Sequence, residues 1–241
     1  TGFGAVYYLE SVMKHEHDTL EGKTVAVAGF GNVAWGVVQK LAELGAKAVT
    51  LSGPDGYIYD PDGITTKEKF DFMLEMSASG RNKVQDYADK FGCKFVAGDK
   101  PWGEKVDIIM PCATQNDVDL TQAKRIVANN IKYYIEVANM PTTNEALRFL
   151  MDQKNMVVAP SKAVNAGGVL VSALEMSQNS ERISWTAEEV DDKLHQIMTE
   201  IHDSSAECAE KYGLGYNLVA GANMVGFQKV ADAMMAQGIA W

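Results

Sequence analysis

Residues 23–44 decide the fold: Lys23-Thr-Val-Ala-Val-Ala-Gly-Phe-Gly-Asn-Val-Ala-Trp-Gly-Val-Val-Gln-Lys-Leu-Ala-Glu-Leu44. The apolar, β-forming run at 23–28 predicts a buried strand, and the stretch 32–44 predicts a helix that Gly45 ends. Between them lies a G-x-G-x-x-A motif at 29–34. Glycines in a turn between a strand and a helix let the backbone approach a pyrophosphate, while the helix N-terminus offers free N–H groups and a positive dipole.

This context favours dinucleotide binding over a plain tight turn, which is the other common role of a glycine pair. An alanine stands where a third glycine would allow the closest packing of helix on strand. The residues of the motif that we expect to contact the cofactor are Gly29, Phe30, Gly31, Asn32 and Val33.

Outward from this motif, short apolar runs and helical stretches alternate. Further strands are predicted at 48–52, 94–96, 106–110, 133–137 and 156–159. Six short strands separated by helical segments imply parallel crossover units. The sequence therefore predicts an α/β fold, with a doubly wound Rossmann-like sheet.

Helical patterns flank the predicted sheet on both sides. Apolar residues at helical spacing open the chain, and after residue 160 the strand pattern stops. Thr186 and Glu189 fit a capping box at the start of a late helix. We expect a leading helix at 1–20, a dinucleotide-binding domain at 21–160 and a helical C-terminal segment at 161–241.

The composition is that of an ordinary globular protein. The 241 residues include 22 Lys and Arg against 32 Asp and Glu, a net charge of −10, and 46% are hydrophobic. A negative chain without a basic cluster is a poor partner for nucleic acid. No apolar run reaches 18 residues and no export signal opens the chain, so we expect no membrane partner and a cytoplasmic location.

Cysteine and histidine do not suggest a metal site. Three cysteines far apart in the sequence suit reduced, structural thiols. His15 and His17 would point apart on a helix, and we expect His195 and His202 to have surface or capping roles. The chain opens on Thr1 without an initiator Met and enters a helical pattern at once, so we expect a piece of a longer polypeptide.

The second predicted strand ends near two candidates for the adenosine end of the cofactor, Ser52 and Asp55. An acidic group about 20 residues after the glycines commonly binds the ribose hydroxyls. Asp55 is equally well interpreted as a simple turn residue. No Lys or Arg lies between Leu51 and Gly63 to meet a 2′-phosphate. A carboxylate about 4 Å from a phosphate charge costs on the order of 4 kcal/mol at an effective dielectric near 20. NAD is therefore favoured over NADP.

Two later strands deliver polar residues to what we expect to be the same sheet edge. The stretches 111–116 and 136–141 follow strand carboxyl ends, where open α/β sheets bind ligands, and include Ala113, Thr114 and Asn139. Capping is the alternative role, because Thr142 and Glu145 also fit a capping box. In the glycine-containing stretch after residue 160, Asn165, Val169 and Ser172 share one face if the segment is helical.

Taken with residues 1–4, 162–169 and 138–143, these motifs make the whole chain resemble the nucleotide-binding, C-terminal half of hexameric bacterial glutamate dehydrogenase. The resemblance implies reversible oxidative deamination of L-glutamate to 2-oxoglutarate and ammonia, with hydride passing to a nicotinamide cofactor. It also implies that Thr1, Asn139 and Asn165 surround the nicotinamide and its ribose, and that Asn32 contacts the cofactor phosphates or ribose. Val169 and Ser172 would face the substrate, with Ser172 reaching its side-chain carboxylate.

The resemblance further implies what this chain lacks. In the family, the catalytic lysine and aspartate and the lysines that grip the substrate belong to an N-terminal domain that precedes Thr1. We therefore expect no catalytic residue in this chain, which alone would be inactive, and a homo-oligomer for the full-length protein. Two alternatives stay open: a sister dehydrogenase of leucine, valine or phenylalanine, and a stand-alone NAD-binding module without catalysis.

Overall fold

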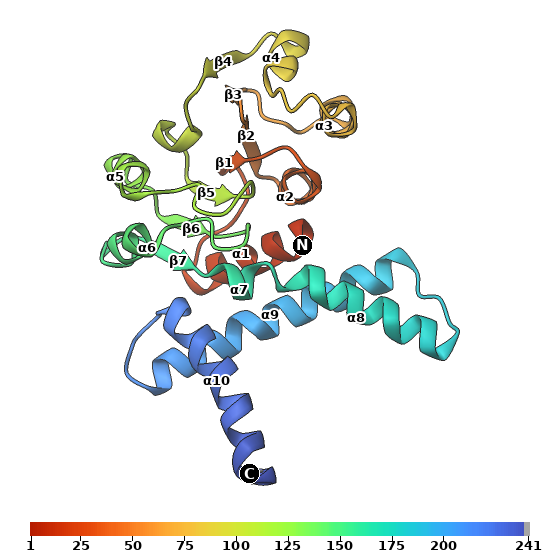
Figure 1. Ribbon diagram of the computed structural model, residues 1–241, viewed down its shortest axis with the longest axis vertical. Helices are drawn as coiled ribbons and strands as arrows, with labels where there is room; N and C mark the ends of the chain where they lie inside the picture. The colour runs from red at the N-terminus through yellow and green to blue at the C-terminus, as the bar shows by residue number, and fades with distance from the viewer. Residues whose placement is uncertain (239–241) are drawn as a thin grey trace.

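The computed structural model describes residues 1–238 and contains one seven-stranded sheet with helices on both faces (Figure 1). The strands are β1 (Thr24–Ala28), β2 (Lys47–Gly53), β3 (Gly56–Tyr59), β4 (Lys94–Ala97), β5 (Ile108–Pro111), β6 (Tyr133–Ile135) and β7 (Val157–Ala159). Their spatial order is β4-β3-β2-β1-β5-β6-β7. The α/β class and the helical C-terminal part predicted from the sequence are confirmed.

Up to β7 the helices lie between the strands in the sequence, except between β2 and β3, and after β7 only helices follow. They are α1 (Gly2–His15), α2 (Asn32–Glu43), α3 (Lys67–Ser79), α4 (Gln85–Phe91), α5 (Leu120–Ala128), α6 (Asn144–Met151), α7 (Ser161–Val164), α8 (Ala166–Glu181), α9 (Ala187–Lys211) and α10 (Leu218–Gln237), with a 3₁₀ turn η1 (Pro101–Gly103). The expected capping box at Thr186 and Glu189 begins α9. The other expected box, of Thr142 and Glu145, does not form: Thr143 caps α6 by accepting the N–H of Ala146, and an alanine at this position cannot complete a box.

One edge of the sheet departs from the all-parallel expectation. β2, β1, β5, β6 and β7 are parallel, whereas β3 runs antiparallel to both β2 and β4. Strand β3 has four residues and follows β2 through the two-residue turn Pro54-Asp55. Gly56 allows the reversal, since its φ is +146° and a Cβ there would collide with the Val96 carbonyl. This hairpin was not predicted from the sequence.

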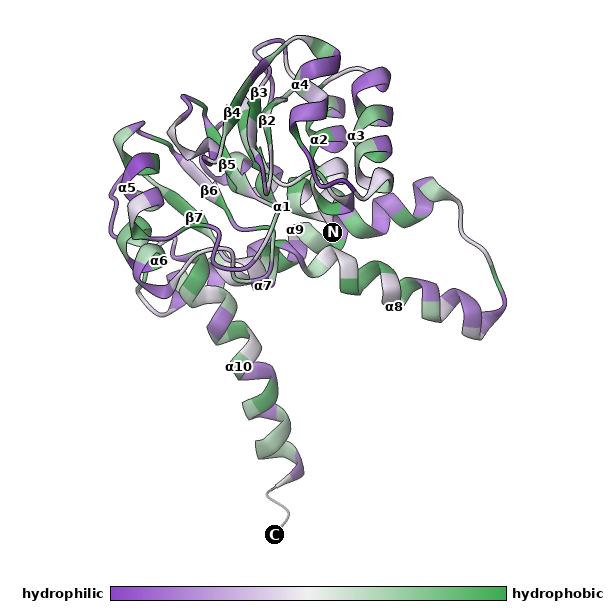
Figure 2. Ribbon diagram, turned by 45° about the horizontal axis from the view of Figure 1, so that its top comes forward, coloured by the Kyte–Doolittle hydropathy of each residue, from purple (hydrophilic) through white to green (hydrophobic). Residues whose placement is uncertain are grey.

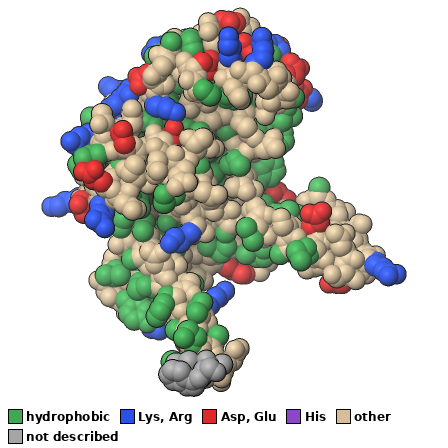
Figure 3. Space-filling view, viewed as in Figure 1, with side chains coloured by type: hydrophobic (Ala, Val, Ile, Leu, Met, Phe, Trp, Pro, Cys, Tyr) green, Lys and Arg blue, Asp and Glu red, His purple; other side chains and the backbone are tan. Residues whose placement is uncertain are grey.

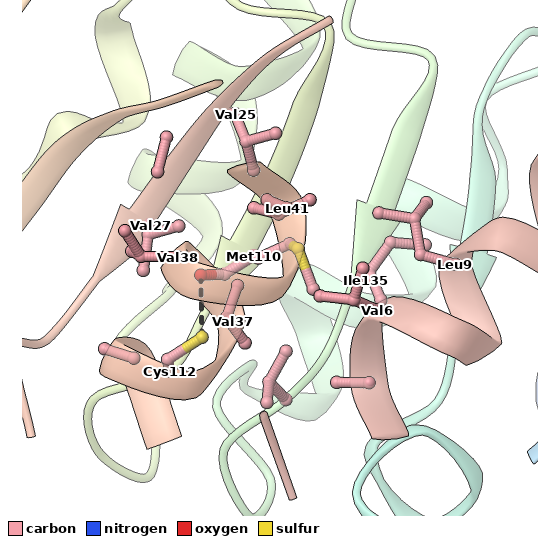
Figure 4. Packing of buried hydrophobic residues seen from close by; sticks show 14 of the residues in the cluster. Val6, Leu9, Val25, Val27, Val37, Val38, Leu41, Met110, Cys112 and Ile135 are labelled. Carbon is pink, nitrogen blue, oxygen red and sulfur yellow. Dashed lines mark hydrogen bonds between the residues drawn. The ribbon is translucent and has the colours of Figure 1, made fainter. Parts of the chain in front are cut away.

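The two faces of the sheet support separate cores. In β1, Val25 and Val27 pack toward α1 and α2, while Ala26 and Ala28 pack toward α5 and α6. This alternation follows from the two-residue period of a strand. Figure 4 shows the first core, in which β1 and β5 side chains meet those of α1 and α2; its labelled members are Val6, Leu9, Val25, Val27, Val37, Val38, Leu41, Met110, Cys112 and Ile135.

Glycines bring the leading helix into backbone contact with its neighbours. A Cβ at Gly2 would lie 2.6 Å from the Val37 nitrogen of α2, and one at Gly4 would lie 3.1 Å from the Gly167 Cα of α8. The Thr1 hydroxyl lies where a Cβ at Gly168 would be. Side chains larger than hydrogen at these positions would push the helices apart. The close crossing therefore fixes Thr1 beside the starts of both α2 and α8.

Helices α8 and α10 project from the sheet and expose apolar side chains. Both reach away from the α/β body in Figures 1 and 2, and Figure 3 shows hydrophobic side chains gathered over α10. Val169 of α8 is 78% exposed and Met235 of α10 is 85% exposed. Such apolar exposure along two helices is typical of an interface with further protein. Within residues 1–238, none of the helices combines the length and the apolar character that a membrane span requires.

The histidine expectation is wrong for His202, which is buried in the corner between α1, α9 and the start of α10. Its Nδ1 lies 2.8 Å from Asp203 Oδ1 and its Nε2 lies 2.6 Å from the Tyr216 hydroxyl. His15 stacks on the Tyr216 ring at a centroid distance of 3.7 Å. Burial lowers the pKa of His202 although Asp203 opposes the shift. Burial in this corner thus favours the neutral form of the imidazole.

This corner predicts an acid-sensitive contribution to stability. Because the folded-state pKa of His202 is lowered, its contribution is present above the ordinary histidine pKa and is lost as the pH falls through the folded value. The variant His202→Gln cannot titrate, so its free energy of unfolding should decline less than that of the parent between pH 7 and pH 5. Urea denaturation at each pH measures this, with the exposed His17→Asn as control. Equal declines for parent and His202→Gln would contradict the prediction.

Candidate functional site

A hollow of about 570 Å³ opens at the carboxyl ends of the parallel strands. It lies between the carboxyl ends of β1 and β5. The chain continues from β1 to β2 on one side and from β5 to β6 on the other, which makes this the switch point at which open α/β sheets bind ligands. It brings together eight residues expected at the site: Thr1, Val33, Ala113, Thr114, Asn139, Asn165, Val169 and Ser172. Cys112, Gln115, Val137, Ala138 and Gly168 complete the lining.

A larger hollow, of about 980 Å³, opens near the starts of β6 and β7, at the opposite end of these strands. Lys132, Lys154 and Tyr216 belong to its lining, which includes none of the residues expected at the site. If size were the only criterion, this hollow would be the candidate functional site. The smaller one is the candidate site because it lies at the strand carboxyl ends, with Val33 from the first turn of α2 in its lining. Gly29, Gly31 and Asn32 do not line it, although Gly29 lies against Ala113, which does.

The structure explains the presence of a glycine differently at the two positions of the turn. Gly29 has φ +87°, and a Cβ there would lie 3.2 Å from the Ala113 Cα and 3.3 Å from the Cys112 carbonyl oxygen. The fold itself therefore requires Gly29. Gly31 has φ −78°, which any residue adopts, and a Cβ there would meet no atom within 4 Å. Gly31 instead leaves open space in front of α2, whose first residue Asn32 is exposed.

Two residues expected at the cofactor lie behind the turn. The Phe30 side chain is 8% exposed and belongs to the core, and Ser52 is 1% exposed. The Ser52 hydroxyl accepts the N–H of Gly29 at 3.1 Å. Neither side chain lines the hollow. Any contact of Phe30 with a ligand would be through its backbone.

Asp55 also has structural partners. Its Oδ1 accepts the N–H of Val84 at 3.0 Å, and its Oδ2 accepts the N–H of Gln85 at 3.1 Å. The carboxylate thus ties the β2–β3 turn to the start of α4. This observation accounts for Asp55 as a turn residue, and its contact with a ribose stays a prediction.

Two asparagines form the polar centre of the hollow. Asn165, between α7 and α8, donates from Nδ2 to the Val137 carbonyl at 3.1 Å and to Asn139 Oδ1 at 2.8 Å. These bonds use both Nδ2 hydrogens of Asn165. They leave its Oδ1 acceptor and the Nδ2 donor of Asn139 without a partner among residues 1–238. The pair offers one acceptor and one donor side by side.

Three titratable side chains near the hollow form hydrogen bonds within the protein. Glu136 is buried at the end of β6, accepts the N–H of Ser161 at 3.0 Å and has a pKa raised by burial. Burial also raises the pKa of the Cys112 thiol, which donates to the Met110 carbonyl. A thiol held neutral is a poor nucleophile. Lys162 hydrogen-bonds Asn223 instead of lining the hollow.

The lining carries no Asp, Glu, His or Lys side chain within the described part of the chain. Residues 1–238 also contain no group of three His, Cys, Asp or Glu that could hold a metal ion. The hollow therefore offers amide, hydroxyl and backbone groups for binding. The amide and hydroxyl side chains do not titrate near neutral pH, so they are not proton acceptors.

The chain belongs to a dehydrogenase family. The family model described as Glutamate/Leucine/Phenylalanine/Valine dehydrogenase matches residues 1–238. The chain is 84% identical over 241 residues to the NAD-specific glutamate dehydrogenase of Clostridium symbiosum, a match that covers 100% of this chain and 54% of that protein. The NAD-specific glutamate dehydrogenase of Bacteroides fragilis (strain YCH46) is 54% identical, covering 99% of this chain and 54% of the relative. The NADP-specific enzyme of Escherichia coli (strain K12) is 47% identical, covering 99% and 53%.

Solved structures agree with this assignment. A structure titled glutamate dehydrogenase superposes with a TM-score of 0.99 at 84% sequence identity, covering 100% of this chain and 54% of that one. Plasmodium falciparum glutamate dehydrogenase 2 superposes with a TM-score of 0.94 at 44% identity, covering 99% and 52%. The chain spans about half the length of the curated relatives it matches.

The bonds of Asp55 predict a stability effect. Asp55→Ala removes a charged acceptor from two backbone N–H groups and should lower the free energy of unfolding by about 1 to 3 kcal/mol. Chemical denaturation measures the loss. The control Asp89→Ala removes an exposed carboxylate from α4 itself and should change stability by less than about 0.5 kcal/mol. If the two variants were equally stable, the Asp55 bonds would contribute nothing to the fold.

Proposed function

We propose that this chain is the nucleotide-binding part of an NAD-linked L-glutamate dehydrogenase. The whole protein would convert L-glutamate, NAD and water to 2-oxoglutarate, ammonia and NADH, reversibly. The observation that carries the proposal is the hollow at the β1/β5 switch point, which gathers eight expected site residues beside the glycine turn. The relatives named NAD-specific glutamate dehydrogenase support both the substrate and the cofactor.

The turn fits the pyrophosphate of a dinucleotide. Neither a positive φ nor a close contact requires a glycine at 31, and the open space there is what a close-lying phosphate requires. The free N–H groups at the start of α2 point toward the same space, with the positive end of a 12-residue helix behind them. We assign phosphate contacts to the backbone of Gly31 and to Asn32, with Val33 beside them.

The amide pair fits the nicotinamide end. A carboxamide presents one oxygen acceptor and an NH₂ donor, which complement the free Nδ2 of Asn139 and the free Oδ1 of Asn165. We assign this recognition to the two asparagines, with Thr1, Ala113 and Thr114 as neighbours in the lining. The cofactor, when bound, supplies the acceptor for hydride, and these residues orient it.

The substrate would lie at the start of α8. Val169 and Ser172 are exposed, three residues apart on one helical face, and both line the hollow. A serine hydroxyl suits a carboxylate better than an aliphatic side chain, so Ser172 favours glutamate over leucine, valine or phenylalanine. We propose that Ser172 contacts the side-chain carboxylate of glutamate and Val169 its carbon chain.

The remaining chemistry would come from a preceding domain. Deprotonating the substrate amine needs a base, and the lining offers none. The relatives are about twice as long as this chain. We propose that their other half supplies the catalytic lysine and aspartate, and that the helical C-terminal segment packs on it through the exposed apolar side chains of α8 and α10. The whole protein would be a cytoplasmic homo-oligomer.

This division predicts binding without turnover. The 241-residue chain should bind NAD more tightly than NADP in calorimetric titrations, because the β2–β3 turn carries a carboxylate and no basic side chain within 51–63. The same preparation should give no glutamate-dependent NADH signal. Turnover at an ordinary enzymatic rate would disprove the division of roles. Tight NAD binding by a whole protein that is inactive on glutamate would instead indicate a binding module.

The open space at Gly31 predicts a selective effect of substitution. Gly31→Val should leave the thermal unfolding midpoint within a few degrees of the parent, because no atom lies within 4 Å of the added Cβ. The branched side chain would occupy the phosphate position, so NAD affinity should fall at least 100-fold. Gly226→Val on exposed α10, where a Cβ also meets nothing within 4 Å, is the matched control. Parent-like affinity in folded Gly31→Val would mean that the glycine only makes a turn.

A further inference from the structure

Strands β1 and β2 separate before they reach the site. Their register shifts between Val25 and Ala26, and their backbone pairing runs only as far as Ala26 and Thr50. Beyond that point two buried hydroxyls of β2 cross to β1. Thr50 Oγ1 accepts the N–H of Val27 and donates to its carbonyl, both at 2.9 Å, and Ser52 Oγ accepts the N–H of Gly29 at 3.1 Å. Side chains thus replace the backbone ladder where the strands diverge.

The last of these bonds reaches the glycine turn itself. On its other side Gly29 meets Ala113 and the Cys112 carbonyl at the end of β5. Ser52 is 1% exposed, so its side chain lies behind the turn and away from the hollow. The turn is therefore held between β2 and β5, with Ser52 as the side-chain acceptor of the Gly29 N–H.

We propose that Ser52 is a positioning residue for the phosphate-binding turn, acting through the N–H of Gly29 without touching the ligand. The inference rests on the proposed NAD function, because the aligned ligand group is the pyrophosphate of a dinucleotide. Without the hydroxyl, a buried N–H loses its acceptor and must move to find another. The N–H groups at Gly31 and Asn32 move with it, and they lose alignment with the phosphates while the sheet stays intact.

Thr50 provides a control from the same strand face. Its hydroxyl is also buried, bonds the β1 backbone two residues before Gly29 and lies one rung further from the turn. Ser52→Ala and Thr50→Val each remove one such hydroxyl, so both should lower the unfolding midpoint. We expect Ser52→Ala to raise the NAD dissociation constant between about 3-fold and 10-fold, the range of one neutral hydrogen bond. Thr50→Val should change it less than 2-fold.

Amide hydrogen exchange gives a second readout. Exchange at Gly29 should accelerate in Ser52→Ala and stay at the parent rate in Thr50→Val. Parent-like affinity together with a protected Gly29 amide in Ser52→Ala would overturn the proposal. An equal loss of NAD affinity in both variants would also overturn it, because general loosening of β2 would then explain the effect.

A third variant covers the case in which Ser52→Ala fails to fold. Ser52→Cys keeps a small side chain with a weaker acceptor, and its NAD affinity should lie below that of the parent. Parent-like affinity in a folded Ser52→Cys would count against the proposal. A parent chain that does not bind NAD would refute the proposed function. Gly29 exchange would then decide alone whether Ser52 holds the turn.

Discussion

The backbone turn at Gly29 is the constraint on which the site depends. Its positive φ favours glycine, and a Cβ there would lie only 3.2 Å from the Ala113 Cα at the end of β5. Because β1 is central in the sheet, the turn leaves it between β2 and β5 and directs α2 across the first core. The N-terminus of α2 consequently faces the hollow formed by the ends of β5 and β6.

A second constraint joins the ends of the chain to this turn. The backbone contacts of Gly2 with α2 and of Gly4 with α8 place Thr1 and the start of α8 on the same hollow. Residues about 170 positions apart in the sequence thereby line one site. The exposed apolar side chains begin on α8 at Val169 and continue on α10. A surface that starts at the hollow and extends away from the sheet is consistent with a site completed by further protein.

Local signals predicted most of this arrangement from the sequence. The six predicted strands and the glycine turn follow from periodicity and from residue types that act on their immediate neighbours. Strand β3 was missed although Pro54-Asp55-Gly56 is a typical turn sequence, because a four-residue strand shows little periodicity. Tertiary contacts decided the rest. The burial of Ser52 and His202, and the bonds of Asp55 to residues 29 and 30 positions later, depend on neighbours that no local pattern reveals.

The central claim is that a dinucleotide binds in the hollow at the β1/β5 switch point. A map of backbone amide chemical shifts during NAD titration tests it most directly, because each lining segment reports separately. The account predicts shifts at Gly29, Gly31, Asn32, Asn139 and Asn165. It predicts none around Lys132 and Lys154, which line the larger hollow near the starts of β6 and β7. Shifts confined to that larger hollow, with the glycine turn unchanged, would contradict the account.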